Sequence, residues 1–244
     1  MIDLHSHVLP GLDDGAANLR EALQICDAAA ADGIEVLAGT PHVRAHDYPT
    51  TPEQMEEALA QLRAAGPAVE IVAGGELDLD ELDRPKEELE RFGLGGSSFL
   101  LVEMPYVGWP IDLPERLFRL RLNGFGVLLA HPERNPDVQD QPERLAPLVE
   151  SGTLVQLTAE SVDGRIGKRA QQCARALLDA QLAHVVASDA HTPEIRAVGL
   201  SPAVAAIGDE ALARWLTEDM PRAILADAET PPRPPARPRR RFFR

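Results

Sequence analysis

The sequence of 244 residues has no long apolar run and few cysteines. No apolar segment approaches the roughly 20 residues that a transmembrane helix needs, and no signal peptide precedes the first apolar segment, which begins at Ile2. We therefore expect a cytoplasmic protein that is not an integral membrane protein. The two cysteines, Cys26 and Cys173, lie in Ala- and Leu-rich segments that are typical of helices. We interpret both as small buried apolar side chains, not as a disulfide or as metal ligands.

Positive charge is also scarce, and much of it lies at one end of the chain. The formal net charge is −15, yet residues 231–244 contain six arginines and no acidic residue, so the rest of the chain carries −21. A surface this acidic repels the phosphate backbone of nucleic acids, which argues against a nuclease. Part of the negative charge is expected to bind cations. Residues 229–244 have the Pro- and Arg-rich composition of a disordered tail, which leaves residues 1–228 as the folded domain.

Short apolar segments alternate with helix-like segments along the chain. Seven apolar runs bounded by Gly, Pro or a helix cap are predicted to be strands, at residues 2–8, 34–40, 69–75, 99–102, 126–130, 153–158 and 183–188. Helices are expected between them, with N-cap spacing at Asn18 and Glu21 and at Thr51 and Gln54. Residues 43–50 show no period and are expected to form a surface loop. The alternation predicts an α/β fold with a parallel sheet, open or closed.

Ionisable residues stand at or just past the carboxyl ends of six of the seven predicted strands. They are His5 and His7, His42, Glu76, Glu103, His131, and Asp189 with His191. In a β/α barrel these strand ends converge on one opening, whereas an open sheet spreads them along an edge. The sequence therefore favours a barrel with a site at the C-terminal ends of its strands.

The first strand contains the densest group of these residues. Asp3, His5 and His7 share one face of an extended chain. Two imidazoles at this spacing can bind one metal ion, and Asp3 is placed to orient an imidazole. A Pro-Gly turn then brings Asp13 and Asp14 back toward the same point. For this stretch alone, a strand end with solvated polar residues is the alternative interpretation.

With Asp14, the strand-end residues give nine candidate metal ligands, namely five His, two Asp and two Glu. A catalytic metal ion binds about three protein ligands and keeps a position for water, so nine side chains suit about two or three ions. Imidazole and carboxylate ligands suit zinc, manganese or iron and leave the identity open. Singly, each residue has a simpler interpretation; a glutamate, for example, can cap a helix. His46, in the expected loop, and His184, at a strand start, are assigned no role.

Two arginines favour a phosphate substrate. Metal clusters of this kind activate water in phosphate-ester and in amide hydrolysis. Arg134 follows His131 by three residues and Arg196 follows His191 by five, and guanidinium groups bind phosphate oxygens in pairs. A solvated loop arginine is the simpler interpretation of either residue.

Seven motifs occur in order between residue 2 and about residue 200. They are IDLHSHVLPGLDDG at 2–15, Thr40-Pro41-His42, Gly74-Gly75-Glu76, Val102-Glu103, His131-Pro132-Glu133-Arg134, Gln156-Leu157-Thr158 and Ser188-Asp189-Ala190-His191. With these motifs the chain resembles the polymerase-and-histidinol-phosphatase (PHP) superfamily, and within it the CpsB/YwqE-type bacterial protein-tyrosine phosphatases. The opening motif combined with HPER is specific, whereas single strand ends are not.

The resemblance implies a distorted seven-stranded (β/α)7 barrel, so that residues 1–228 form a PHP metal-dependent phosphatase domain. It implies up to three metal ions, most often manganese, with iron, zinc or magnesium as alternatives. A metal-bridging hydroxide would attack phosphorus directly, without a cysteinyl intermediate. The implied substrate is a phosphotyrosine protein, namely the tail of a membrane-associated bacterial tyrosine kinase that controls capsular or exopolysaccharide synthesis.

The resemblance also implies roles for individual residues. His5, His7, Glu76 and Asp189 would surround one ion; Glu76 would bridge to a second ion held by Glu103 and His131; and Asp14, His42 and His191 would hold the third. Arg134 and Arg196 match the arginines that grip the phosphate. Asp14 rather than Asp13 is chosen as a ligand on the resemblance.

Two departures from the family pattern lie beside the expected phosphate site. Asn135 stands where the family usually has an aromatic residue, and Ala-Val-Gly follows Arg196 where the family tends to have prolines. Both bear on substrate preference more than on metal binding. A small-molecule phosphatase of the histidinol-phosphate type is therefore an alternative. A further alternative is a non-catalytic binding module whose basic tail docks to an anionic membrane or an acidic partner.

Overall fold

Ten strands occur within the residues that this computed structural model describes, which are 1–192 and 196–235. They are β1 (Ile2–Ser6), β2 (Val36–Gly39), β3 (His42–Arg44), β4 (Tyr48–Pro49), β5 (Glu70–Ala73), β6 (Glu76–Leu77), β7 (Phe99–Glu103), β8 (Gly126–Ala130), β9 (Leu154–Thr158) and β10 (Val185–Ala187). One sheet has the order β1-β2-β5, and the other has the order β10-β9-β8-β7-β6-β3-β4. All pairs are parallel except β3 with β4.

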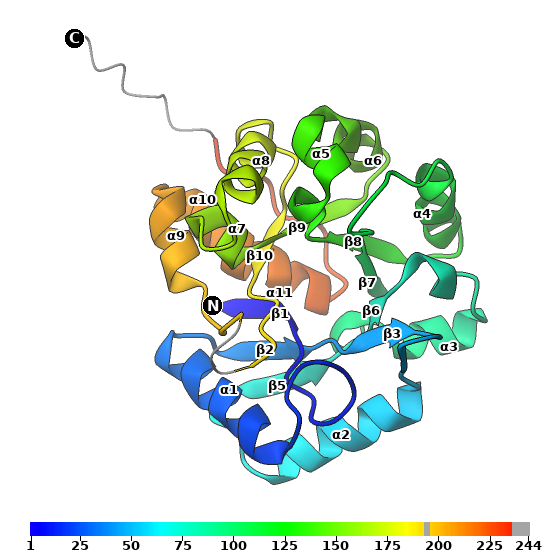
Figure 1. The fold of residues 1–244 in the computed structure, drawn as a ribbon, viewed down its shortest axis with the longest axis vertical. Coiled ribbons are helices and arrows are strands. Elements are labelled where there is room, and N and C mark those ends of the chain that lie inside the picture. Colours follow the sequence, from blue (N-terminus) through cyan, green and yellow to red (C-terminus); the bar gives the residue numbers. More distant parts are fainter. Residues whose placement is uncertain (193–195, 236–244) are drawn as a thin grey trace.

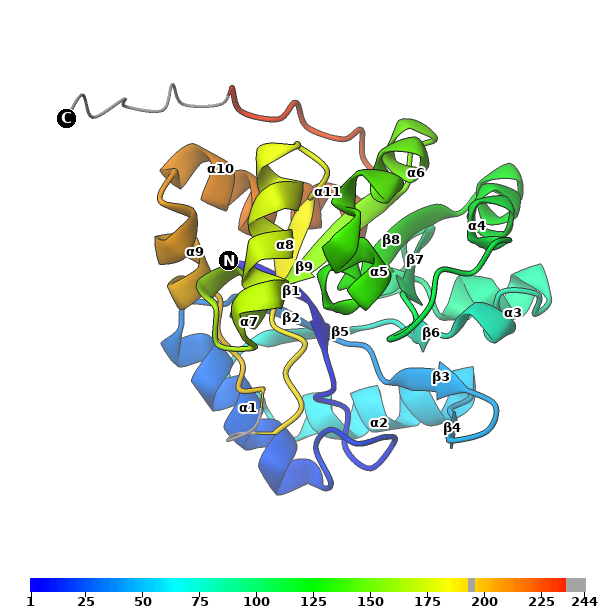
Figure 2. The same cartoon turned by 45° about the horizontal axis from the view of Figure 1, so that its top comes forward.

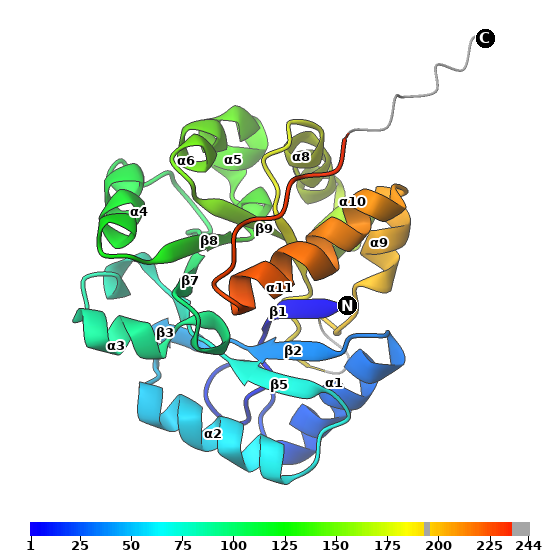
Figure 3. The same ribbon diagram turned by 180° about the vertical axis from the view of Figure 1, so that it is seen from behind.

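Most helices lie around the outside of the strands (Figure 1, Figure 2). The α-helices are α1 (Leu19–Ala31), α2 (Pro52–Ala64), α3 (Lys86–Arg91), α4 (Leu113–Leu122), α5 (Pro136–Asp140), α6 (Ala146–Glu150), α7 (Ala159–Asp163), α8 (Lys168–Asp179), α9 (Ser201–Ile207), α10 (Glu210–Arg214) and α11 (Met220–Leu225). Short 3-10 turns occupy Leu79–Glu81, Leu94–Gly96, Pro132–Arg134 and Pro142–Leu145, and a π turn occupies Trp215–Asp219. Figure 3 shows α11 crossing the strands, where it packs against β1. In the described parts of the chain, no helix combines the length and the apolar character that crossing a bilayer requires.

The alternation of strands and helices that the sequence predicts is confirmed, because each of the seven predicted strands overlaps a strand of the structure. Two predicted helix starts are confirmed as well. Asn18 Oδ1 accepts a hydrogen bond from Glu21 N (3.2 Å) at the start of α1. Thr51 and Gln54 form a reciprocal capping box at the start of α2, which satisfies backbone donors that the first helical turn leaves free.

The strands form the core because both of their faces are covered. In β8, the consecutive residues Val127, Leu128, Leu129 and Ala130 have no exposed surface, although their side chains alternate between the two faces. This near-continuous apolar sequence is typical of a parallel sheet buried on both sides.

The prediction of a loop at residues 43–50 is wrong. The structure has β3 there, followed by β4, which pairs with it in a short antiparallel hairpin. These strands have three and two residues, which is too short for an alternating pattern to show in the sequence. Their register matters for the site, because β3 pairs with β6 so that His42 lies opposite Glu76.

Two glycines allow the chain to pass from β5 to β6. A Cβ atom on Gly75 would lie 2.7 Å from Phe92 Cδ1, and Gly75 N donates a hydrogen bond to Phe92 O (2.9 Å). The backbone approaches Phe92 too closely for any side chain. Glu76 then follows at the start of β6, with its side chain fully buried.

The segment expected to be a disordered tail, residues 229–244, is described by the structure as far as residue 235. Within that part, Trp215 Nε1 donates a hydrogen bond to Pro231 O (3.0 Å). The Arg233 guanidinium stacks on the Trp215 ring, with 5.0 Å to the ring centroid, and donates to Ala183 O. Pro231 and Arg233 therefore contact the folded body, and the expectation for residues 236–244 lies outside the described residues.

Replacing Leu129 by alanine should test the buried sheet. The substitution leaves a cavity in the middle of β8, so the free energy of unfolding should fall by about 2–5 kcal/mol in chemical denaturation. Leu122→Ala is the matched control, because Leu122 is 70% exposed at the end of α4 and should change the stability by at most about 0.5 kcal/mol. Similar losses for both variants would contradict the packing described above.

Candidate metal centre

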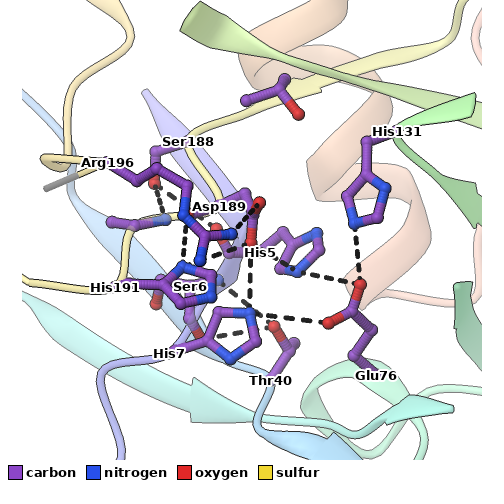
Figure 4. Close-up of polar contacts among 12 residues, drawn as sticks. His5, Ser6, His7, Thr40, Glu76, His131, Ser188, Asp189, His191 and Arg196 are labelled. Carbon is purple, nitrogen blue, oxygen red and sulfur yellow. Dashed lines mark hydrogen bonds and ion pairs between the residues drawn. The ribbon is translucent and has the colours of Figure 1, made fainter. Parts of the chain in front are cut away.

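The nine candidate ligands converge from many parts of the sequence. In Figure 4, His5, His7, Glu76, Asp189 and His191 point toward one another. Eight of the nine are buried, and Asp14 is the exposed one. They come from β1 and the residue after it (His5, His7), the following turn (Asp14), β3 (His42), β6 (Glu76), β7 (Glu103), the residue after β8 (His131) and the segment after β10 (Asp189, His191).

Their donor atoms form four groups in which every atom lies within 4.8 Å of the others. The groups are His5, His7 and Asp189; His5, Glu76 and His131; His42, Glu76 and Glu103; and His7, Asp14, His42 and His191. Each of the nine predicted residues therefore belongs to at least one group that could hold a metal ion.

The chemistry of these donor atoms fits a divalent cation. Five buried ligand atoms make no well-directed hydrogen bond, namely His5 Nε2, His42 Nδ1, Glu76 Oε2, Glu103 Oε1 and His191 Nε2. A buried polar atom without a partner is costly, and a cation would satisfy several of these atoms at once. Mixed nitrogen and oxygen donors suit manganese, zinc or iron.

The buried carboxylates of the centre are stabilised in their ionised form by neighbouring imidazole and guanidinium groups. Burial alone would raise the pKa of the Glu76 carboxyl, but the imidazoles of His5 and His42 outweigh burial and hold that pKa well below its ordinary value. Burial likewise opposes ionisation of Asp189, while Arg134 and His5 keep the pKa of this carboxyl well below its ordinary value. Both carboxylates are therefore ionised at neutral pH and available as ligands.

The grouping differs in several respects from the grouping that the resemblance implies, and the place of Glu103 is one of them. In the implied grouping, Glu76, Glu103 and His131 hold one ion together. In the structure, Glu103 is grouped with His42 and Glu76, and His131 falls in a separate group with Glu76. Arg44 contributes to this difference, because its Nε lies 3.1 Å from Glu103 Oε2 and draws the carboxylate toward β3. No sequence signal pointed to Arg44, which lies in the segment expected to be a loop.

The two adjacent aspartates have different partners. Asp13 Oδ2 lies 2.6 Å from His7 Nδ1 and accepts a hydrogen bond from His42 N (2.8 Å). Asp14 Oδ1 instead lies 3.4 Å from His191 Nε2. Asp13 therefore orients the His7 ring from behind, and Asp14 is the carboxylate that faces the centre.

The expectation that Asp3 orients an imidazole is wrong. Asp3 Oδ1 accepts from the backbone N–H groups of Ser188 (3.0 Å) and His5 (3.3 Å), and so ties β1 to the end of β10. The side chain that orients His5 is Gln156 of β9, whose Oε1 lies 3.0 Å from His5 Nδ1. A glutamine in an otherwise apolar strand was the available signal for this role.

Both predicted arginines reach the centre. Arg134 Nη1 lies 2.6 Å from Asp189 Oδ2, and Arg196 Nη1 lies 3.3 Å from the same oxygen. The Nε and Nη2 atoms of Arg134 are buried and have no hydrogen-bond partner. An arginine with two free, adjacent donors is arranged to bind an anion with paired oxygens, such as phosphate.

Backbone strain is concentrated at the same place. Among the described residues, the five non-glycine residues with positive φ include His131 (φ 36°), Asp189 (φ 54°) and Arg196 (φ 48°). Such conformations are rare for residues with a Cβ atom, and they persist where the surrounding structure holds them, often in functional sites. For His131 and Asp189, this conformation turns the side chain toward the centre just after β8 and β10 end.

The two histidines without an assigned role lie outside all four groups. Burial lowers the pKa of His184 to about 4, and its neutral Nδ1 accepts a hydrogen bond from Val155 N (3.1 Å). His46 lines a cavity beside the centre, together with Tyr48 and Tyr106.

The arrangement defines a class of protein. Buried imidazoles and carboxylates that can share cations, beside guanidinium groups with free donors, are typical of metal-dependent enzymes that act on phosphate esters. Residues 1–227 match the family profile described as capsular polysaccharide synthesis, CpsB/CapC, and the chain belongs to this family. The resemblance drawn from the sequence motifs is therefore confirmed.

Relatives with assigned names include tyrosine-protein phosphatases. The tyrosine-protein phosphatase YwqE of Bacillus subtilis is 32% identical over 201 residues, which are 80% of this chain and 79% of that protein. The tyrosine-protein phosphatase CpsB of Streptococcus pneumoniae is 27% identical over 241 residues, which are 93% and 99% of the two chains. A crystal structure from a study of YwqE and CpsB, described as metal-dependent tyrosine phosphatases, has a TM-score of 0.84 and 30% identity, and the match covers 97% of this chain and 100% of that chain.

The two cysteines should be unreactive in the native protein. Both are buried, and burial raises the pKa of each thiol to about 12, so at pH 8 both stay protonated and lack nucleophilic character. We expect no reaction of the native protein with 5,5′-dithiobis(2-nitrobenzoate) within minutes at pH 8, and reaction of two thiols per chain after unfolding in guanidinium. Rapid labelling of one native thiol would contradict this assignment.

Proposed function

We propose that this chain is a metal-dependent protein-tyrosine phosphatase that hydrolyses phosphotyrosine. The observation that carries the proposal is the convergence of nine imidazole and carboxylate groups beside Arg134, two of whose donors have no partner. The relatives at 32% and 30% identity, which are tyrosine phosphatases by name and metal-dependent by description, support the substrate and the need for metal.

We assign all nine residues as ligands of two or three ions. His5, His7, His42 and Glu76 belong to two groups each, and shared ligands fit ions that lie close together better than they fit separate sites. Manganese is the ion that we favour on the family resemblance, and zinc, iron and magnesium are the alternatives that elemental analysis distinguishes. When bound, the ions supply activation of water and neutralisation of charge on the phosphoryl group.

The protein groups that bind the substrate are the two arginines. Arg134 would hold phosphate oxygens with Nε and Nη2, while its Nη1 stays paired with Asp189. Arg196 also pairs with the Asp189 carboxylate. The two guanidinium groups therefore lie close together and can bind different phosphate oxygens. The leaving group would be a phenol with a pKa of about 10, which departs more readily than the alkoxide of an alkyl phosphate.

We propose that the two sheets together form one distorted barrel. Supporting contacts join β1 to the end of β10, where Asp189 N donates to His5 O (2.8 Å) and His7 N donates to Ala190 O (2.7 Å). In addition, β2 and β3 are separated by two residues, as are β5 and β6. With each of these pairs counted as one interrupted strand, and with β4 left out because it pairs only with β3 in the antiparallel hairpin, the number of barrel strands is seven.

The proposed physiological substrate is the phosphotyrosine tail of a membrane-associated bacterial tyrosine kinase of capsular or exopolysaccharide synthesis. The family description, capsular polysaccharide synthesis, supports this context. The cytoplasm is the compartment that the proposal requires, because kinases use ATP there.

The Glu76→Gln variant tests metal binding and activity together. Glu76 belongs to two ligand groups, so we expect the variant to lose at least one ion per chain by elemental analysis. Its turnover of a phosphotyrosine peptide should fall by about 100-fold or more, since even groups that only orient ligands contribute about 10- to 100-fold. Glu115→Gln, an exposed glutamate on α4, is the control. Wild-type metal content and activity in Glu76→Gln would refute the assignment.

The Arg134→Lys variant tests phosphate binding. It keeps the positive charge but removes the paired donors, so kcat/KM for the phosphotyrosine peptide should fall by about 10- to 100-fold, with the metal content unchanged. Arg119→Lys, on the exposed side of α4, should behave as the wild type. An unchanged kcat/KM in Arg134→Lys would show that the guanidinium group does not bind the substrate.

A further inference from the structure

A cavity of about 510 Å³ opens beside the metal centre. Its lining residues are Asp14, His42, Arg44, His46, Asp47, Tyr48 and Tyr106. Two of them, Asp14 and His42, are candidate metal ligands, so the cavity is continuous with the centre. The chain contains only two tyrosines, and both line this cavity.

The two tyrosines present flat ring faces beside the ligands. Tyr48, in β4, stacks on the His42 ring with 5.4 Å between centroids and 19° between planes. Tyr106, in the segment between β7 and α4, stacks on the His131 ring at 6.1 Å and 21°. His42 and His131 are ligand candidates from different strands, so the tyrosines approach the centre from two different elements. Tyr106 remains 47% exposed, which leaves surface for a further contact.

We propose that Tyr48 and Tyr106 bind the aromatic ring of the substrate and thereby select aryl phosphates over alkyl phosphates. The proposal rests on the proposed phosphatase function, which places the phosphoryl group at the metal centre and Arg134. A phenyl ring attached to that group extends into the adjoining cavity, where two aromatic faces are available. Aromatic rings attract one another in stacked and edge-to-face geometries beyond the effect of buried area, whereas an alkyl chain has no such face.

The charged residues of the cavity do not provide an equivalent contact for the ring. The Arg44 guanidinium is paired with Glu103, and Asp14 faces His191. His46 and Asp47 lie in the turn between β3 and β4, where they are exposed. The tyrosines are therefore the residues of this cavity that suit an uncharged aromatic group.

The test uses the metal-loaded full chain with Tyr48→Ala, Tyr106→Ala and the corresponding Phe variants. Kinetics compare a phosphotyrosine peptide with the same peptide carrying phosphoserine, and calorimetry compares phenylphosphonate with methylphosphonate, which are not hydrolysed. Each alanine variant should raise KM for phosphotyrosine and Kd for phenylphosphonate about twofold to tenfold. The kcat value, the affinity for methylphosphonate and the metal content should not change. The Phe variants keep the ring and should restore the preference for aryl ligands.

Phe118→Ala is the matched control, because it removes a half-exposed aromatic ring from α4, outside the cavity. Equal losses for aryl and alkyl ligands would overturn the proposal, since they would show that the tyrosines only support the histidines behind them. No loss in either alanine variant would overturn it as well. If the wild-type protein hydrolyses neither peptide, the proposed function fails, and the phosphonate affinities alone then decide the role of the tyrosines.

Discussion

The charge balance inside the metal centre is the constraint on which the rest of the structure depends. Glu76 and Asp189 are fully buried and ionised, and their charges are tolerated because His5, His42 and Arg134 surround them. Removing one partner from such a cluster would leave an uncompensated buried charge, which is strongly destabilising. Divalent cations bound to the candidate ligands would add further compensation, which would link metal binding thermodynamically to folding stability.

The backbone meets this constraint by interrupting regular strands at the points where ligands are required. Gly74 and Gly75 end β5 so that Glu76 can enter the centre, and positive φ angles after β8 and β10 turn His131 and Asp189 inward. Parallel strands place all these interruptions at the same end of the sheets. Most candidate ligands thus lie in strands or just after them, and the connecting segments supply Asp14, Arg196 and Tyr106.

Apolar runs between caps predicted the strands well, because strands buried on both faces have a continuous apolar sequence that does not depend on distant contacts. Once the strands were located, the ionisable residues at their carboxyl ends predicted which side chains form the centre. The hairpin of β3 and β4 could not be predicted, since its five residues are too few to show a local pattern and β3 is held by pairing with the distant β6. The roles of Asp3, Asp13 and Gln156 depend on which backbone and ring atoms face them in three dimensions, and spacing carries no such information.

The packing of Arg233 on Trp215 anchors the last described residues to one end of the strands. Arg233 donates to Ala183 O, which lies just before β10, so the chain leaves the described structure near the amino ends of the strands. The metal centre lies at their carboxyl ends. Residues 231–233 therefore meet the body at the end of the strands opposite to the metal centre, and they line no part of the cavity beside that centre.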